Sequence, residues 1–148
     1  MRFAYAVPAI IVLTLLVGSG LFIYIIPRTD LSVRTVYHET PGGGGTGGVI
    51  NVNVLLKNSG NTDIEDLSID VKVLNSTGRY MSGQIGRDVA ISPGRCAELK
   101  INFVGSQYDT YAISIHLRFE SRSGTTIANL DHVTREDEMN LVFIDELP

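Results

Sequence analysis

Three histidines carry the most versatile chemistry in this 148-residue sequence, because an imidazole can act as a base, an acid or a metal ligand. They are His38, His116 and His132, and they are far apart along the chain. Neither a Gly-x-Ser-x-Gly nucleophile motif nor a His-Glu-x-x-His zinc motif accompanies them. An enzyme needs a convergent set of groups, so the sequence predicts a non-enzymatic protein with no catalytic residue, no metal ligand set and no cofactor.

The segment from Asn61 to Asp66, NTDIED, is a candidate for calcium binding, because calcium loops place oxygen ligands at alternate positions. Such a loop needs glycine at position six and glutamate at position twelve. This sequence has Asp66 and Lys72 there, so the hypothesis fails at both positions. A looser calcium site made from loop carboxylates stays open as an alternative, and its candidates are Asp131, Glu136, Asp137 and Glu138.

The tripeptide Asn75-Ser76-Thr77 matches the acceptor pattern for N-glycosylation. It falls in a predicted turn between two strands, where an acceptor is reachable. The sequence therefore makes Asn75 a candidate glycosylation site, provided that this part of the chain is exported.

Two further features could be mistaken for chemical sites. The glycine-rich segment 41–48, PGGGGTGG, lacks the Gly-Lys-Ser/Thr ending of a phosphate-binding loop, and no helix pattern follows it. We interpret it as a flexible connection between two strands. Cys96 is the single cysteine, so no intrachain disulfide can form, and its neighbours Ala97 and Leu99 lead us to predict a small buried side chain there.

The chain that must position any such site begins with an apolar stretch. Residues 3–27, FAYAVPAIIVLTLLVGSGLFIYIIP, contain no charged side chain, and Arg28 follows Pro27 directly. A helix needs roughly 20 apolar residues to cross a hydrocarbon core of about 30 Å. We therefore predict an N-terminal transmembrane anchor over residues 1–28 that contacts membrane lipid through residues 3–27.

A cleaved secretory signal is the competing interpretation, with Val17-Gly18-Ser19 as the cleavage site before Gly20. The apolar run resumes at once with residues 21–26, which is untypical of a cleaved signal and favours an uncleaved signal anchor. The charges that set orientation are Arg2 on one side against Arg28 and Arg34 on the other, and this bias alone does not decide. Our preferred topology keeps the short N-terminus inside and places the rest of the chain outside the cytoplasm.

Residues 29–148, about 120 residues, suffice for one domain with a core of its own. Of the 12 Lys and Arg residues only Arg2 precedes the apolar stretch, which leaves 11 against 16 Asp and Glu. This mildly acidic balance argues against nucleic acid, whose binding depends on clustered positive charge.

Alternation of apolar and polar residues is the main pattern of this domain, and a period of two is typical of strands. Clear alternation occurs around residues 50–56, 67–73, 97–103 and 111–119, and weaker signals lie at 31–36, 125–130 and 140–144. Residues 79–91 predict one or two short strands among glycines. Seven or eight half-apolar strands without a convincing amphipathic helix predict an all-β, antiparallel β-sandwich of the immunoglobulin-like kind.

Two turns within this pattern resemble those of a known family. Asn58, Gly60 and Asn61 follow one strand, and Pro93-Gly94 precedes another, so that VLLKNSGNTD, ISPGRCAELKINF and YAISIHLRFE together resemble CARDB-type adhesion domains of prokaryotic, especially archaeal, cell surfaces. The resemblance covers roughly residues 30–125 and rests on turn and core residues. It implies the sandwich fold and a place on a cell surface, and it leaves function open.

Together these features favour a membrane-anchored surface protein, or an accessory subunit of a membrane complex, whose sandwich contacts a protein partner. A second hypothesis is a ligand-binding module for calcium or carbohydrate. The chain has no Trp, so the aromatic platform for a sugar would have to come from Tyr37, Tyr80, Tyr108 or Tyr111. A narrower version of the first hypothesis is a stator-like component of an archaeal surface filament.

Overall fold

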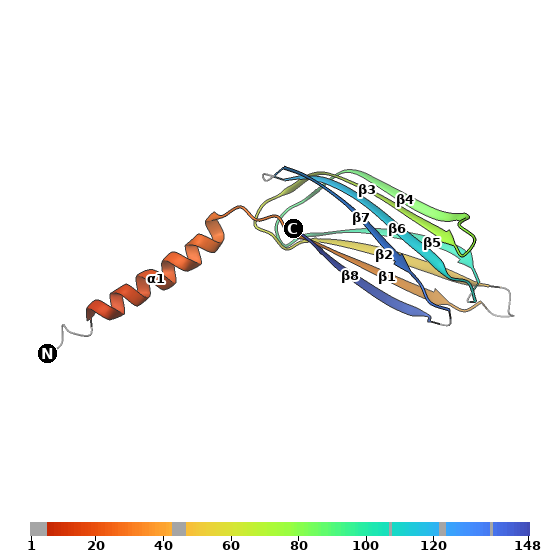
Figure 1. Ribbon diagram of the computed structural model, residues 1–148, viewed down its shortest axis with the longest axis horizontal. Helices are drawn as coiled ribbons and strands as arrows, with labels where there is room; N and C mark the ends of the chain where they lie inside the picture. Colours follow the sequence, from red (N-terminus) through yellow and green to blue (C-terminus); the bar gives the residue numbers. More distant parts are fainter. Residues whose placement is uncertain (1–5, 43–46, 107, 122–123, 137) are drawn as a thin grey trace.

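The computed structural model describes residues 6–42, 47–106, 108–121, 124–136 and 138–148 (Figure 1). Within them the chain forms one helix followed by eight strands. The elements are α1 (Ala6–Ile25), β1 (Leu31–Thr40), β2 (Gly48–Asn58), β3 (Ile64–Asn75), β4 (Tyr80–Ile91), β5 (Cys96–Gly105), β6 (Tyr111–Ser121), β7 (Gly124–Val133) and β8 (Asn140–Leu147).

The strands form two four-stranded antiparallel sheets, with the orders β5-β2-β1-β8 and β4-β3-β6-β7. The sheets lie face to face, so the predicted all-β sandwich is confirmed (Figure 1). Helix α1 joins the sandwich at one end, which we call the joint end. We call the opposite end the far end. The hairpin between β1 and β2 lies at the far end, and residues 43–46 of the glycine-rich segment lie outside the described residues.

Apolar side chains at alternate positions of each central strand fill the space between the sheets. In β2 the side chains of Ile50, Val52, Val54 and Leu56 are fully buried, while Asn51 and Asn53 between them are only partly covered. Strands β3 and β6 supply the facing side chains in the same way, and Tyr37, Phe103 and Tyr111 form an aromatic cluster with centroid separations of 6.5 and 5.2 Å. This burial of apolar area is the main force that holds the two sheets together.

Strand β4 differs from the sequence-based expectation of one or two short strands, because residues 80–91 form one strand of 12 residues. Its pairing with β3 has register shifts near Ile64, Leu67 and Val73. Such irregularities add residues out of phase and destroy the period of two that identifies a strand. Asp88 lies in the left-handed region with φ 54°, which is typical of a residue at such a break.

Cys96 is another correction, because its side chain is exposed and not buried. Ala97 and Leu99 do face the core, but alternation then requires residue 96 to point outward. The apolar neighbours were therefore evidence against burial, since they occupy the opposite face of β5.

Helix α1 projects from the joint end, away from both sheets (Figure 1). The large apolar side chains described for it are exposed, with fractions between 53% and 67%. Among the described residues, no helix meets the combined requirements of length and apolar character for a membrane span. The predicted transmembrane helix over residues 3–27 is therefore left without support from the structure.

Candidate functional site

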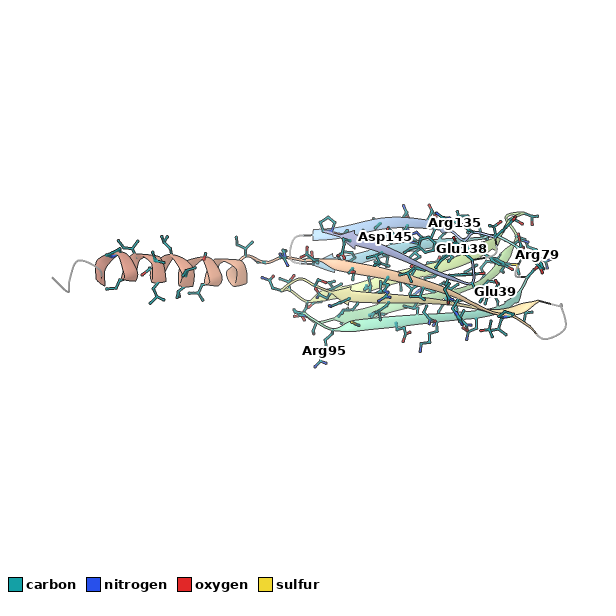
Figure 2. The ribbon with its side chains drawn as sticks, turned by 90° about the horizontal axis from the view of Figure 1, so that it is seen from below. Glu39, Arg79, Arg95, Arg135, Glu138 and Asp145 are labelled. Carbon is teal, nitrogen blue, oxygen red and sulfur yellow. The ribbon has the colours of Figure 1, made fainter. Side chains whose placement is uncertain are left out.

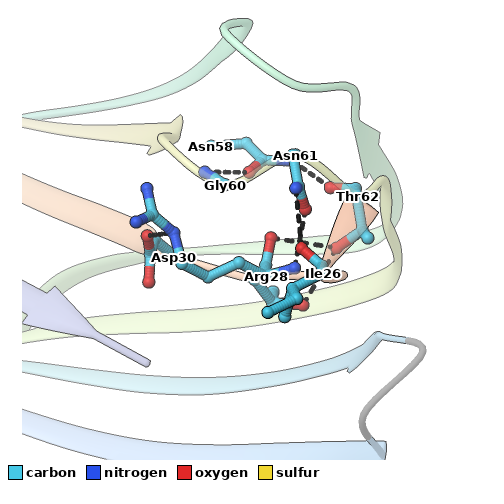
Figure 3. A network of polar contacts seen from close by, with 8 residues as sticks. Ile26, Arg28, Asp30, Asn58, Gly60, Asn61 and Thr62 are labelled. Carbon is cyan, nitrogen blue, oxygen red and sulfur yellow. Dashed lines mark hydrogen bonds and ion pairs between the residues drawn. The ribbon is translucent and has the colours of Figure 1, made fainter. Parts of the chain in front are cut away.

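The connection between α1 and the sandwich is the most heavily hydrogen-bonded loop contact in the described part of the chain, and we call it the joint. It consists of the linker, residues 26–30, and the turn at 58–62 between β2 and β3 (Figure 3). The side chain of Asn61 bridges two linker residues, because its Oδ1 accepts from the Arg28 amide at 2.6 Å and its Nδ2 donates to the Ile26 carbonyl at 2.8 Å.

Backbone groups extend this contact along the linker. The Asn61 amide donates to the Arg28 carbonyl at 2.9 Å, and the Ser59 amide donates to the Asp30 carbonyl at 2.8 Å. The Thr62 hydroxyl donates to the same Arg28 carbonyl at 3.2 Å and lies 3.1 Å from the Thr29 hydroxyl. At about 1 kcal/mol for each net hydrogen bond, the joint contributes a few kcal/mol against the entropy of ordering the linker.

Gly60 lets the linker approach the turn closely. A Cβ placed on this residue would lie 2.2 Å from the Arg28 carbonyl oxygen and 2.8 Å from the Asp30 amide nitrogen. Both contacts are with backbone, so a side chain here would displace the linker from its seat. The need for glycine at this position thus comes from space.

The side chain of Asn58 holds the turn in place by hydrogen bonds from within the sandwich. Its fully buried side chain donates through Nδ2 to the carbonyls of Thr62 and Ile91, each at 2.8 Å, and accepts from the Gly60 amide at 3.0 Å. Its backbone also pairs with the Pro93-Gly94 turn region, since the Gly94 amide donates to the Asn58 carbonyl at 2.8 Å. The two turns that carry the family resemblance therefore meet at one residue.

Charged groups around the joint are exposed or half-buried. Arg28 Nε lies 2.5 Å from Asp30 Oδ2, and the Arg28 side chain is 64% exposed. An ion pair of this exposure contributes little stability. A hollow of about 310 Å³ beside the joint is lined by polar residues and includes Glu65 and Glu120, which are cross-strand neighbours. The joint consequently has the chemistry of a polar, hydrogen-bonded attachment between the linker and the sandwich.

The three histidines lie apart from one another. His38 contacts the Asn140 side chain, and His116, whose side chain points outward, contacts Asn129. His132 Nε2 on β7 lies 2.9 Å from Asp145 Oδ2 on β8, so this pair joins the two sheets. The two atoms lack the geometry of a hydrogen bond. The His132 ring also stacks on Phe143, at 4.4 Å between centroids.

The candidate calcium ligands are not assembled into a site. Asp131 accepts a hydrogen bond from Ser114, and Glu138 pairs with Arg135 at 3.4 Å. Asp137 lies outside the described residues. Over the described ranges, no three His, Cys, Asp or Glu side chains gather as metal ligands.

Asn75 lies at the far end, at the last position of β3. Its Oδ1 accepts hydrogen bonds from the Thr77 amide at 3.1 Å, the Thr77 hydroxyl at 2.8 Å and the Arg79 amide at 2.8 Å. The acceptor tripeptide thus forms a closed turn in which the threonine hydroxyl contacts the asparagine side chain.

A buried polar pair lies at the same end. The Tyr37 hydroxyl donates to Glu39 Oε2 at 3.2 Å, and Glu39 is only 4% exposed (Figure 2). Burial, reinforced by the Glu39 carboxylate, raises the pKa of Tyr37 strongly. Burial also raises the pKa of Tyr111, although a hydrogen bond with the Ser106 backbone opposes part of that increase.

Sequence reasoning identified the turns at the joint but not their partners. The residue types of Arg28, Asp30 and Thr62 do not indicate contact. Arg28 and Thr62 are 34 positions apart in the sequence and meet only because of the fold. The His132–Asp145 pair was missed for a similar reason. The one available signal was that His132 and Asp145 each occupy a position of their strand at which the alternation predicts an inward-facing side chain.

No family model matches the sequence, and no curated protein matches it. Among solved structures, a Bordetella pertussis protein described as ApaA is 13% identical, with 73% of this chain and 94% of that chain covered and a TM-score of 0.54. A protein from Archaeoglobus fulgidus is 10% identical, with 78% and 99% covered and a TM-score of 0.43. A family 2 β-glucuronidase is 12% identical, with 67% and 11% covered and a TM-score of 0.44.

The likeness to the Bordetella protein supports the two-sheet fold, and at this identity it supports nothing more. The other two TM-scores are too low to carry an argument. The CARDB resemblance and an archaeal origin are therefore not confirmed by any family, whereas the sandwich that the resemblance implied is present.

Proposed function

We propose that this chain is a non-enzymatic, single-span membrane protein whose sandwich lies outside the cytoplasm and binds another protein of the cell envelope or of a membrane complex. The observation that carries the proposal is the exposed apolar surface of α1. Its members are Ile10, Ile11, Val12, Leu13, Leu15, Leu16, Val17 and Leu21. A continuous apolar surface of this size needs cover from lipid or protein.

The length of the apolar stretch supports lipid as that cover. Helix α1 has 20 residues, and at about 1.5 Å per residue it rises about 30 Å, the thickness of a hydrocarbon core. The proposal rests on residues 3–27 as a whole, and residues 3–5 lie outside the described part of the chain. Arg28 and Asp30 at the joint would then lie among the lipid headgroups.

Extraction of membranes from cells that express the full chain tests the anchor. Wild-type protein should stay in the pellet after alkaline carbonate washing. Leu13→Lys combined with Val17→Lys should move most of it to the supernatant, because charges at the centre of a span are costly. Ile127→Lys combined with Ile144→Lys is the matched control, since these two side chains are exposed on the sandwich. Wild-type protein in the supernatant would overturn the anchor.

The lone cysteine offers a direct test of orientation. Cys96 is exposed on the edge strand β5, so a membrane-impermeant maleimide added to intact cells should label it when the sandwich is outside. Labelling that appears only after lysis would reverse the topology and contradict this part of the proposal.

The far end of the sandwich is the surface that we assign to the protein partner. Large exposed apolar side chains gather in the strands and loops of this end, namely Val49, Tyr80, Val104, Tyr108, Val133 and Met139. Val49 and Val104 are cross-strand partners, and Tyr108 is 70% exposed. Aromatic residues and methionine are enriched in protein interfaces, which supports a protein over a small polar ligand.

Gentle solubilisation of native membranes followed by a mass measurement tests the contact. We expect a complex larger than the monomer, and Val104→Ser combined with Tyr108→Ser should shift it toward the monomer. Ile127→Ser combined with Ile144→Ser is the control, because these exposed residues lie within strands β7 and β8, away from the loops of the far end. A wild-type monomer in native membranes would contradict the proposal.

The finer assignment, a CARDB-type domain of an archaeal surface protein, belongs to the same proposal. It is supported by the meeting of the two family-like turns at Asn58. Identification of the co-purified partner would test it, and a cytoplasmic partner would refute it.

A further inference from the structure

We infer that the joint holds the sandwich in one fixed orientation on α1, so that the far end points away from the membrane and is presented there to its protein partner. This inference rests on the proposed function, because it takes α1 as the membrane anchor. It goes further by specifying the orientation of the domain and the position of the surface that meets the partner.

The first argument is the restraint on the linker. Residues 26–30 could act as a swivel, as short unbonded linkers do. Here the carbonyl of Ile26, the amide and carbonyl of Arg28 and the carbonyl of Asp30 all bond to the turn at 58–62. Rotation of α1 about the linker would break these bonds together.

The second argument is the rigidity of the turn that holds the linker. Asn58 ties this turn to the carbonyls of Thr62 and Ile91, and its side chain is fully buried in the sandwich. Gly60 leaves no gap between turn and linker, since even a Cβ would overlap the Arg28 carbonyl. The linker is therefore seated on the body of the domain and not on a mobile loop.

The third argument is direction. The strands run from the joint end to the far end, and α1 leaves the joint end away from them, in line with the strands in Figure 2 and inclined to them in Figure 1. Strands β3 and β4 have 12 residues each, and at about 3.3 Å per residue they span about 40 Å. With α1 in the membrane, the far end lies up to about 40 Å from the headgroups.

This height determines the kind of partner. Lipid headgroups lie out of reach of the exposed apolar residues at the far end, which include Tyr108 and Met139. The partner is a neighbouring protein subunit that extends beyond the headgroups. It contacts loops of the far end, opposite the hollow beside the joint.

Distances between spin labels on the full chain in lipid nanodiscs test this inference. The labels replace Val12 on α1 and Asn102 on β5, both of which are exposed, and Cys96→Ser removes the native thiol. Wild-type protein should give one narrow distance distribution. Asn61→Ala and Gly60→Ala should each widen it about twofold, because a freed linker samples many orientations.

Asn129→Ala is the matched control, since this asparagine bonds to His116 on an exposed strand face, away from the joint. It should leave the distribution narrow, and circular dichroism should show an intact sandwich in every variant. A broad wild-type distribution in protein that enters nanodiscs would overturn the fixed orientation alone. Failure of the wild-type chain to enter nanodiscs would overturn the anchor, and the distribution could then be measured in detergent.

Discussion

The Asn58 side-chain amide lies 2.8 Å from the carbonyl oxygen of Ile91, and this bond connects the end of β2 to the end of β4. These strands belong to different sheets, so the bond joins the two layers at the joint end. The same amide group holds the Thr62 carbonyl, which places the seat of the linker in contact with both sheets.

Replacement of Asn58 should therefore destabilise the whole sandwich. Asn58→Ala leaves two buried carbonyls and the Gly60 amide without their partner, and the expected loss is about 2–4 kcal/mol. Urea unfolding of the full chain in detergent measures it. Asn129→Ala, an exposed replacement, should change stability by no more than about 0.5 kcal/mol. Equal effects from the two variants would show that Asn58 has no special role.

Much of the sandwich could be predicted from alternation, and the physical reason is burial of one face only. Side chains at every second position of β2, β5 and β6 fill the core, so the pattern of the sequence repeats the pattern of the pleat. The length of β4 could not be predicted, because its irregular pairing with β3 breaks the period. The prediction that Cys96 is buried was wrong, because it relied on the apolar character of its neighbours. The alternation of side chains along β5 was the informative signal.

The joint lay beyond sequence reasoning because its bonds are long-range. The turn around Gly60 is recognisable from its residue types, but nothing in those types indicates that a linker 33 positions earlier lies on it. The close approach at Gly60 is likewise visible only in three dimensions. A short repeat of apolar residues in the sequence indicates the local backbone conformation. A contact between a loop and a distant linker produces no such repeat.

The contact between His132 and Asp145 should couple the edges of the two sheets. Their side chains are 10% and 28% exposed, so removal of one partner leaves a partly buried polar group. We expect Asp145→Ala to cost about 1–2 kcal/mol, because the largely buried imidazole loses the polar group beside it. Urea unfolding at neutral pH measures the loss.

A double-mutant cycle distinguishes this coupling from simple loss of packing. His132→Leu combined with Asp145→Leu should recover most of the stability that either single change removes, because apolar side chains of similar size can fill the seam. Strictly additive losses would show that the two side chains do not interact.

The closed turn at Asn75 predicts a glycan at the far end when the chain is exported in a glycosylating host. Asn75→Gln and Thr77→Ala should each lower the mass by that of one glycan, because the acceptor needs both the amide and the hydroxyl. Ser76→Ala is the matched control, since the Ser76 hydroxyl contacts Asp109 and is not part of the acceptor pattern. Identical intact masses for wild type and Asn75→Gln, apart from the substitution, would contradict the prediction.

Buried tyrosines should make the sandwich sensitive to alkali. Burial raises the pKa of both Tyr37 and Tyr111 in the folded chain, whereas an unfolded tyrosine ionises near pH 10. The resulting stability is complete below about pH 10 and is lost as the pH rises toward the folded-state pKa, because only the unfolded chain then releases protons. Urea unfolding at a series of alkaline pH values should show the free energy of unfolding falling as the pH rises above about 10, by at most about 1.4 kcal/mol per pH unit for each tyrosine.

The variant Tyr37→Phe should lower that slope by at least half, because the more strongly shifted of the two hydroxyls is absent. At neutral pH it should cost about 1 kcal/mol, since Glu39 loses the hydrogen bond that it accepts from Tyr37. Tyr108→Phe is the matched control, because Tyr108 is 70% exposed, and its slope should equal that of the wild type. An unchanged slope in Tyr37→Phe would show that Tyr37 can ionise in the folded chain as readily as in the unfolded one.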